Sequence, residues 1–306
     1  MKGIFELEDE GLDTRDFDGQ NNLLLVDGLN LGFRYKQQSL FDHAAPYMNT
    51  VNSLAKSYGC NHVIVGSDYG KSTFRKEVSE GEYKANREIM RKEQTEEEAE
   101  KLDNKIKEAT EKVKKFLEGF EKALALVGTM HHTIKLRNVE MDDIAAYIVK
   151  KYGHLFDNIW LISSDKDWDL LLKPNVHRFS YVTRKEYTVD NFAESHEGCE
   201  NPEDYVSMKV FSGDPGDNVA GFPGVGAKRA YNLIREHGSA LDVYDALPLA
   251  GKQKYIQSIN NDPEKILRNY ELMDLLSYCE EAINHPDNNN TKLIDDIMQE
   301  IINELD

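Results

Sequence analysis

The sequence predicts an α/β fold, in which a mostly parallel central sheet is flanked by helices. Short apolar runs rich in β-branched residues recur along the chain, and amphipathic helical patterns separate them. Strands that are apolar along their whole length are typical of a parallel sheet covered on both faces. After about residue 192 the composition shifts to a shorter helical region. We therefore expect a sheet-based core followed by a helical C-terminal region.

Five runs are expected to be strands: residues 22–28, 62–68, 132–136, 158–165 and 177–182. Between the first two, apolar residues recur at helical spacing, at Met48, Val51, Leu54, Ala55 and Tyr58. After the third run, Ile144, Ile148 and Val149 repeat with the same period. This alternation of apolar strand and amphipathic helix is the pattern expected for successive strand–helix–strand units.

A long charged insert, residues 79–125, separates the second and third strands. Its first part places Lys84, Arg87 and Arg91 on one face of an expected helix. Its second part predicts an amphipathic helix, with apolar residues at Ile106, Val113, Leu117, Phe120 and Leu124. Glutamates are interleaved with the basic residues. The insert is therefore either a strand-gripping element, with Tyr83 stacked on a base, or a solvated surface helix.

Changes in composition divide the chain into four parts. Residues 1–20 form an acidic N-terminal tail, 21–190 the core with its insert, 191–285 the helical region, and 286–306 a C-terminal loop and helix. No apolar run approaches the roughly 18 residues that cross a bilayer, and the N-terminus lacks the basic-then-apolar order of a secretory signal. The three cysteines are scattered without a C-x-x-C pair, which suits reduced thiols. These features predict a cytoplasmic protein without a membrane partner.

Acidic residues follow nearly every expected strand at the point where the strand ends. The set is Asp27, Asp68, Glu140, Asp142, Asp143, Asp165, Asp167, Asp214 and Asp217. Because the carboxyl ends of parallel strands share one edge of the sheet, these side chains are expected to converge there. Two carboxylates about 4 Å apart repel by roughly 4 kcal/mol at an effective dielectric near 20. A convergent cluster therefore needs cations or large upward pKa shifts.

Oxygen ligands without nearby histidine or cysteine favour Mg²⁺ or Mn²⁺ over zinc. A pair of such ions suits phosphodiester hydrolysis. Each acidic motif also has an ordinary explanation, since Asp27 fits a strand-end turn and Asp165 a helix N-cap. The net charge of −18 argues against a nucleic-acid partner unless the negative charge is concentrated where cations bind. A metal site is favoured because so many acidic residues are expected at the same edge of the sheet.

The motif GFPGVGAKRA, residues 221–230, resembles the helix-hairpin-helix motif that binds the DNA backbone. Gly224 and Gly226 flank a tight turn whose N–H groups are placed to meet a phosphate near a helix N-terminus. Lys228 and Arg229 add positive charge. The alternative is a plain helix cap and turn.

The complete set of motifs resembles the bacteriophage-type 5′ nucleases, the flap endonuclease and 5′–3′ exonuclease family. The resemblance spans about residues 23–279 and is carried, in family order, by LLLVDGLNLGFR, GSDYGKSTFRKE, EYKANR, VEMDDIAAYIV, LISSDKDWDLLL, SGDPGDNVAGFPGVGAKRAYNLI and LPLAGKQKYIQ. It implies a helical arch over the active site and a two-magnesium centre. It also implies a helix-hairpin-helix segment that holds duplex DNA, often with a bound potassium ion.

The resemblance also implies roles for individual residues. The tighter metal site takes Asp68, Glu140, Asp142, Asp143 and Asp165 with Asp27 nearby, and the second takes Asp167, Asp214 and Asp217. Lys84 is expected to stabilise charge on the scissile phosphate, Tyr83 to stack on the terminal base and Arg87 to contact phosphate. Further DNA contacts are expected from Lys71, Arg75, Arg91 and the hairpin residues.

The implied activity is Mg²⁺-dependent cleavage of DNA at single-strand/duplex junctions, 5′ flaps or free 5′ ends, giving 5′-phosphate and 3′-hydroxyl products. Mn²⁺ is expected to substitute for Mg²⁺, and RNA in a hybrid is an open further substrate. The protein is expected to act as a monomer in phage-type replication. Two alternatives stay open, a structure-specific ribonuclease and a non-catalytic DNA-binding protein. A phosphohydrolase with an aspartyl nucleophile is disfavoured, because Leu25 stands where such enzymes need an aspartate.

Overall fold

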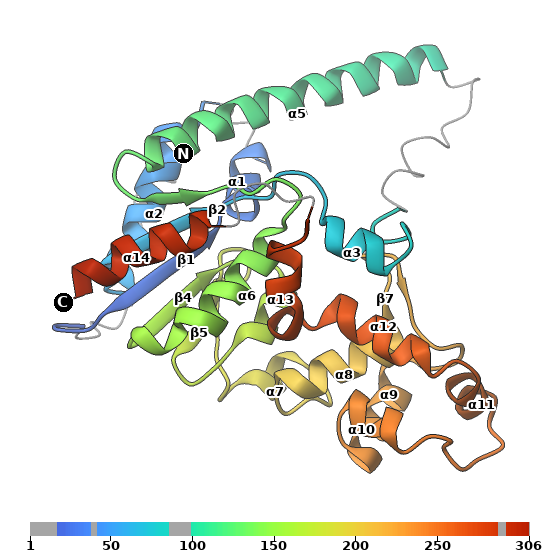
Figure 1. Cartoon of the computed structure of the whole chain (residues 1–306). Helices are drawn as coiled ribbons and strands as arrows, with labels where there is room; N and C mark the ends of the chain where they lie inside the picture. Colours follow the sequence, from blue (N-terminus) through green and yellow to red (C-terminus); the bar gives the residue numbers. More distant parts are fainter. Residues whose placement is uncertain (1–16, 38–41, 86–98, 287–291, 306) are drawn as a thin grey trace.

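A six-stranded sheet forms the centre of the computed structural model (Figure 1). The structure describes residues 17–37, 42–85, 99–286 and 292–305, with the backbone alone for 99–109. Strands β1 (Asn22–Asp27), β2 (His62–Gly66), β3 (His132–Ile134), β4 (Asn158–Ile162) and β5 (Val176–Ser180) run parallel. Strand β6 (Lys185–Tyr187) pairs antiparallel with β5. The mostly parallel sheet predicted from the sequence is confirmed, and β6 is an addition too short to show a pattern.

The strand order β3-β2-β1-β4-β5-β6 places the first strand in the middle of the sheet. The chain runs outward from β1 to β3 and then returns to β4 on the other side of β1. Val26 pairs with both Val65 and Ile162, so the three central strands end at about the same level. In open α/β sheets, ligands bind beyond the carboxyl ends at such a reversal.

Helices cover both faces of the sheet, because alternate side chains of each strand point to opposite sides. Leu24 and Val26 of β1 belong to one core, and Leu23 and Leu25 to the other. The first core is covered by α1 (Gly28–Gln37), α2 (Ala44–Ser57) and α5 (Ala99–Val127). The second is covered by α6 (Met141–Tyr152), α13 (Leu275–Ile283) and α14 (Leu293–Leu305). The helical patterns predicted within α2 and α6 are confirmed.

The long helix α5 extends beyond the sheet (Figure 1). Phe120 and Leu124 of its predicted apolar face are buried, but Val113 is 39% exposed and Leu117 is 44% exposed. The buried face instead includes Phe116, whose ring stacks on Phe33 of α1 and on His43 at the start of α2, so Val113 and Leu117 lie outside the face that packs. The prediction for Val113 and Leu117 was therefore wrong. The side chain of Ile106 lies outside the described residues.

The C-terminal region is a set of short helices that continues the second core. They are α7 (Phe192–Ser195), α8 (Pro202–Ser212), α9 (Ala227–His237), α10 (Ala240–Asp245), α11 (Lys254–Asn261) and α12 (Glu264–Met273). Between α8 and α9 lies a small hairpin, β7 (Gly213–Asp214) and β8 (Val219–Ala220). The described residues also contain three shorter helices, α3 (Thr73–Val78), η2 (Gly153–Leu155) and η3 (Lys166–Leu171). Within the described residues, every helix is too short or too polar to cross a membrane.

Candidate active site

A cavity of about 370 Å³ opens at the carboxyl edge of the sheet. Seven of the nine predicted carboxylates line it, namely Asp27, Asp68, Asp142, Asp165, Asp167, Asp214 and Asp217. Lys84 also reaches the cavity, and Leu29, Asn30 and Phe33 from the first turns of α1 form part of its wall. The predicted convergence of acids is therefore present in the fold.

Local hydrogen bonds hold these carboxylates at the strand ends. Asp27 Oδ1 accepts a bond from Asn30 N at 3.2 Å, and Asp27 Oδ2 accepts one from Ser163 Oγ at 3.0 Å. Ser163 Oγ in turn accepts a bond from Asp165 N at 3.1 Å, which joins the ends of β1 and β4. Asp68 Oδ1 accepts a bond from Met141 N at 2.6 Å, at the start of α6. The N-terminal N–H groups of a helix lack intrahelical partners, so a carboxylate there is favourable.

The first group of carboxylates is Asp27, Asp68, Asp142 and Asp165, and its members repel one another in a way that the charge of Lys84 only partly offsets. Burial, together with the charge of Asp68, raises the pKa of Asp27 to about 7. Burial and the charges of Asp165 and Glu140 hold the pKa of Asp142 well above its usual value. Burial and Asp167 raise the pKa of Asp165 as well. A divalent cation among these oxygens replaces repulsion with attraction, which is the physical reason for a metal here.

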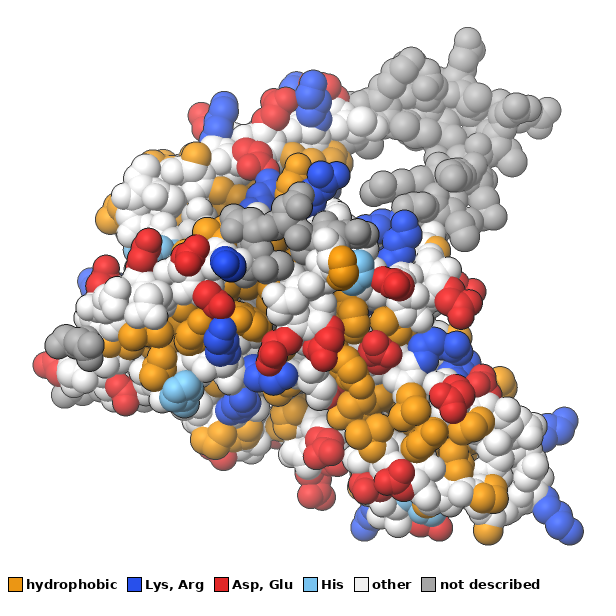
Figure 2. All heavy atoms as spheres, in the orientation of Figure 1, with side chains coloured by type: hydrophobic (Ala, Val, Ile, Leu, Met, Phe, Trp, Pro, Cys, Tyr) orange, Lys and Arg blue, Asp and Glu red, His pale blue; other side chains and the backbone are white. Residues whose placement is uncertain are grey.

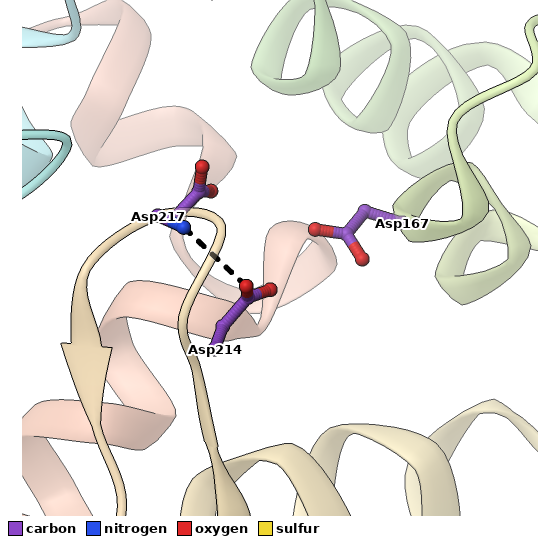
Figure 3. A group of neighbouring side chains, drawn as sticks. All are labelled: Asp167, Asp214 and Asp217. Atoms are coloured by element: carbon purple, nitrogen blue, oxygen red, sulfur yellow. Dashed lines mark hydrogen bonds between the residues drawn. The ribbon is translucent and has the colours of Figure 1, made fainter. Parts of the chain in front are cut away.

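The second group comprises Asp167 from η3 and Asp214 and Asp217 from the β7–β8 turn (Figure 3). One oxygen from each lies within 4.8 Å of the others. Asp214 Oδ1 accepts bonds from Gly216 N at 2.8 Å and Asp217 N at 3.3 Å, which fixes the turn. The three carboxylates are thus held together by two separate segments of the chain.

Lys209 lies between two of these acids. Its Nζ donates to Asp167 Oδ1 at 2.6 Å and lies 2.9 Å from Asp214 Oδ2. Burial alone would lower the pKa of Lys209, but the charges of Asp167 and Asp214 outweigh it and hold the pKa above its usual value. The second group therefore contains a built-in cation that contacts two of its three carboxylates directly.

Glu140 anchors Lys84 at the side of the cavity. Lys84 Nζ lies 2.9 Å from both Oε1 and Oε2 of Glu140. Burial alone would raise the pKa of Glu140, but Arg75 and Lys84 outweigh it and hold the pKa below its usual value. Lys84 has φ +54° and lies in a turn, so the expectation that it begins a helical face was wrong.

Three further expectations are corrected by burial and pairing. The ring of Tyr83 is 5% exposed, and its hydroxyl lies 3.1 Å from Glu140 Oε2 and 2.9 Å from Asp217 Oδ2, so it is not placed to stack on a base. Arg75 is 4% exposed and therefore not a surface DNA contact. Its Nη1 and Nη2 donate to the two oxygens of Asp143 at 2.5 and 2.6 Å. Asp143 accordingly faces Arg75 and does not line the cavity.

Sequence reasoning missed several residues that shape the cavity. Trp168 is fully buried, and its Nε1 donates to Asp142 Oδ1 at 2.7 Å. Phe33 is 41% exposed and stacks on Phe116, with ring centroids 5.4 Å apart. Trp168 lies inside the motif LISSDKDWDLLL, and Phe33 lies inside LLLVDGLNLGFR. Both could therefore have been proposed as site residues from their place in these motifs. Lys209 had no such signal, because only the fold brings it to Asp167.

The Gly221–Ala230 segment contains the loop that connects β8 to α9 and the start of α9. Gly224 has φ +79°, which glycine adopts without strain, and Gly226 immediately precedes α9. A Cβ added at Gly226 would meet nothing within 4 Å, so the start of α9 is open to a ligand. Arg229 Nη1 donates to Gly224 O at 2.5 Å and its guanidinium lies 4.9 Å from the Tyr255 ring, so this side chain also braces the turn. Lys228 is exposed.

The other predicted DNA contacts fall into two classes. Lys71 is exposed between β2 and α3, whereas Arg87 and Arg91 lie outside the described residues. On the face drawn in Figure 2, acidic and basic side chains are interspersed and do not form one basic patch.

Two family models match the chain along nearly its whole length. Residues 22–197 match the N-terminal resolvase-like domain of 5′-3′ exonucleases, and residues 200–293 match the C-terminal SAM fold of the same enzymes. The chain belongs to this 5′–3′ exonuclease family. Within the family architecture, the first domain carries the cavity carboxylates from Asp27 to Asp167, and the second carries Asp214, Asp217 and the hairpin.

Individual relatives agree with this assignment. The flap endonuclease of Escherichia phage T5 is 48% identical over 86% of this chain and 87% of its own length. The crystal structure of the phage T5 D15 protein co-crystallised with metal ions matches with a TM-score of 0.78 and 45% identity, covering 93% of this chain and 99% of that one. A D15 flap endonuclease complex with DNA and metal ions matches with a TM-score of 0.80 and 43% identity, covering 93% and 99%.

Proposed function

We propose that this exonuclease-family protein is a Mg²⁺-dependent, structure-specific 5′ nuclease. It acts as a 5′–3′ exonuclease and flap endonuclease on DNA at single-strand/duplex junctions, and leaves 5′-phosphate and 3′-hydroxyl ends. The observation that carries the proposal is the convergence of seven carboxylates and Lys84 on one cavity at the carboxyl edge of the sheet. A solved complex of the related D15 protein with DNA and metal ions supports the choice of partner and cofactor.

The side chains of the cavity fit hard divalent cations. Among the described residues that line it, the anionic groups are all carboxylates, and none is histidine or cysteine. Carboxylate oxygens of this kind suit Mg²⁺, with Mn²⁺ as a substitute. Asp27, Asp68, Asp142 and Asp165 hold one ion in this proposal, and Asp167, Asp214 and Asp217 hold the second. When bound, the ions activate the attacking water and stabilise the leaving oxygen.

Lys84 supplies a fixed positive charge to the scissile phosphate. Burial alone would lower the pKa of Lys84, but Glu140 and Asp217 outweigh it and raise the pKa, so the ammonium stays protonated at neutral pH. A preorganised cation placed where negative charge develops lowers the barrier more than the same cation in water. Glu140 and Tyr83 act as positioning residues for this group, since both contact Lys84 or its partners.

Duplex DNA is held in this proposal by the C-terminal region, residues 191–285. Backbone N–H groups at the start of α9 and the ammonium of Lys228 meet backbone phosphates. The exposed ring of Phe33 offers a stacking surface beside the cavity, in place of the buried Tyr83. Arg87 and Arg91, which lie outside the described residues, are proposed to contact the single strand. The proposed role of the insert as an arch over the active site depends on the same undescribed range.

A cleavage assay tests the proposal directly. A 5′-labelled flapped duplex is incubated with the protein in Mg²⁺, in Mn²⁺ and in EDTA, beside an RNA flap of the same sequence. The expected result is cleavage at the junction with either metal and none with EDTA, with a 5′-phosphate on the product. Binding without cleavage in both metals would favour the non-catalytic alternative. Preferred cleavage of the RNA flap would favour the ribonuclease alternative.

We further propose that the hairpin can hold a potassium ion, as the family resemblance implies. Gly221 O accepts a bond from Lys265 Nζ at 2.9 Å, and Gly224 O accepts one from Arg229 Nη1 at 2.5 Å. Because a carbonyl oxygen has two lone pairs, each can also bind an ion.

A further inference from the structure

The root of the insert, residues 82–84, is tied to the turn that carries the second group of carboxylates. Asn218 Nδ2 donates to Glu82 O at 2.8 Å, and Lys84 N donates to Asp217 O at 2.8 Å. The hydroxyl of Tyr83 lies 2.9 Å from Asp217 Oδ2. The two segments are 136 residues apart in the chain at the Asn218–Glu82 contact, so only the fold brings them together.

Both sides of this connection use left-handed backbone. Lys84 has φ +54° and Asn218 has φ +60°. This conformation costs most residues roughly 1–2 kcal/mol, although asparagine adopts it more readily than others. A lysine in this region needs its surroundings to hold it there. The bonds from the root to Asp217 and Asn218 are the contacts that do so.

The connection fixes where the Lys84 ammonium lies. With its backbone held against Asp217, the side chain reaches Glu140 at 2.9 Å and lies 3.8 Å from Asp217 Oδ1. The backbone bond of Lys84 does not depend on its side chain. The amide of Asn218 adds a second attachment two residues earlier, which stops the root from pivoting about the first.

We propose that Asn218 is a positioning residue for Lys84, acting through the carbonyl of Glu82. The inference rests on the proposed role of Lys84 in cleavage. The competing explanation is that Asn218 occupies its position only because asparagine tolerates positive φ. The two explanations predict different effects for a glycine at position 218. Glycine tolerates this backbone conformation fully but has no side-chain amide to donate.

The main variant is therefore Asn218→Gly, with Glu80→Gly as its matched control. Glu80 also has positive φ, +54°, and its side chain is exposed near the same root. For Asn218→Gly we expect the single-turnover rate on a flapped duplex to fall about tenfold, because small displacements of a catalytic group are costly. DNA affinity should stay within about twofold, since Asn218 is not assigned to phosphate binding. Glu80→Gly should match the unmodified protein in both measurements.

A double-variant comparison separates positioning from a general structural role. If Asn218 acts through Lys84, Asn218→Gly should slow the Lys84→Ala protein no further, because the two effects are then not additive. An equal slowing in both backgrounds would overturn the proposal, as would an unchanged rate in Asn218→Gly alone.

Amide hydrogen exchange gives a readout that does not require activity. In Asn218→Gly the peptide that covers residues 82–85 should exchange faster, while the peptide that covers β1 should be unchanged. Unchanged exchange at 82–85 overturns the positioning role whether or not the protein cleaves DNA. Failure of the unmodified protein to cut any flap would instead overturn the proposed function, so the two failures are distinct.

Discussion

Asp142 and Asp143 are neighbours in the sequence but lie in two regions, one at the cavity and one beneath it, where they have different partners. Asp142 faces the cavity, and the neutral indole of Trp168 donates a hydrogen bond to it. Asp143 faces away, and both of its oxygens are bound by Arg75. The same residue type, one position apart on α6, is therefore a candidate metal ligand in one case and half of a buried ion pair in the other.

The three aspartates that follow β4 also differ in whether they face the cavity. Asp165 and Asp167 line the cavity, whereas Asp169 is buried beneath it and binds Arg178 through Nε at 2.5 Å and Nη2 at 2.8 Å. His196 Nε2 lies 2.8 Å from the same carboxylate. The comparison teaches that the carboxylates beneath the cavity are held by charged protein partners, whereas the first group accepts hydrogen bonds from neutral backbone, hydroxyl and indole groups.

The largest expected effect comes from removing a charge on the cavity side. Asp165 Oδ1 accepts a bond from Asp167 N at 2.9 Å, and asparagine keeps that acceptor, so Asp165→Asn changes mainly the charge. We expect single-turnover cleavage in Mg²⁺ to fall about 100-fold or more, with DNA affinity within a few-fold. The exposed Asp190→Asn is the control. Full activity in Asp165→Asn would remove this residue from the metal site.

The next effect comes from removing a charge beneath the cavity. Asp169 and Arg178 are 1% and 2% exposed, so Asp169→Asn leaves a buried guanidinium without its counter-charge. We expect the free energy of unfolding to fall by about 3 to 5 kcal/mol in urea titrations. Manganese affinity of the folded protein should change little. Normal stability with lost manganese binding would contradict the division into two regions.

Lys209 is an exception to this division, because it is a protein cation that contacts carboxylates of the cavity itself. Lys209→Met keeps a long side chain but removes the ammonium from Asp167 and Asp214. If the ammonium competes with a metal ion for these oxygens, manganese affinity in calorimetric titration should rise about tenfold. Weaker binding in Lys209→Met would show that the ammonium orients the ligands and does not compete.

The smallest effect concerns α14, far from the cavity. Burial alone would raise the pKa of Asp295, but bonds from Tyr152, Lys151 and Tyr147 outweigh it and hold the pKa below its usual value. An aspartate whose pKa is lower in the folded protein than in the unfolded chain stabilises the fold at pH values above its unfolded pKa, which is near 4. That stabilisation is lost as the pH falls through the pKa of the folded protein. Because the site is partly exposed, Asp295→Asn should cost about 1 kcal/mol at pH 7.

The pH dependence is the check on this last prediction. The difference in unfolding free energy between Asp295→Asn and the unmodified protein should shrink below about pH 4, where the aspartate loses its charge. Asp296→Asn, exposed in the same first turn of α14, serves as the control for helix-dipole effects. A pH-independent difference would mean that Asp295 stabilises α14 without its charge.

Much of the fold was accessible from the sequence because its signals are local. Apolar runs such as that of β1 are recognisable without knowing their neighbours, and Asp27 and Asp68 follow from the rule that parallel strands end at one edge. Lys84 was found through the family resemblance, but its turn conformation was not, because a positive φ in a lysine has no sequence pattern. The buried ring of Tyr83 likewise depends on Val219, Leu272 and Met273, which are distant in the chain.

The sequence alone determined the mostly parallel sheet and the set of acids at its edge, because strand period and strand end are properties of short segments. The tertiary structure decided which of those acids are neutralised. Arg75 meets Asp143 across 68 residues and Lys209 meets Asp167 across 42, so no local pattern assigns these pairs. Charge compensation acts through space, and only the packed chain shows which carboxylates still need a cation from outside.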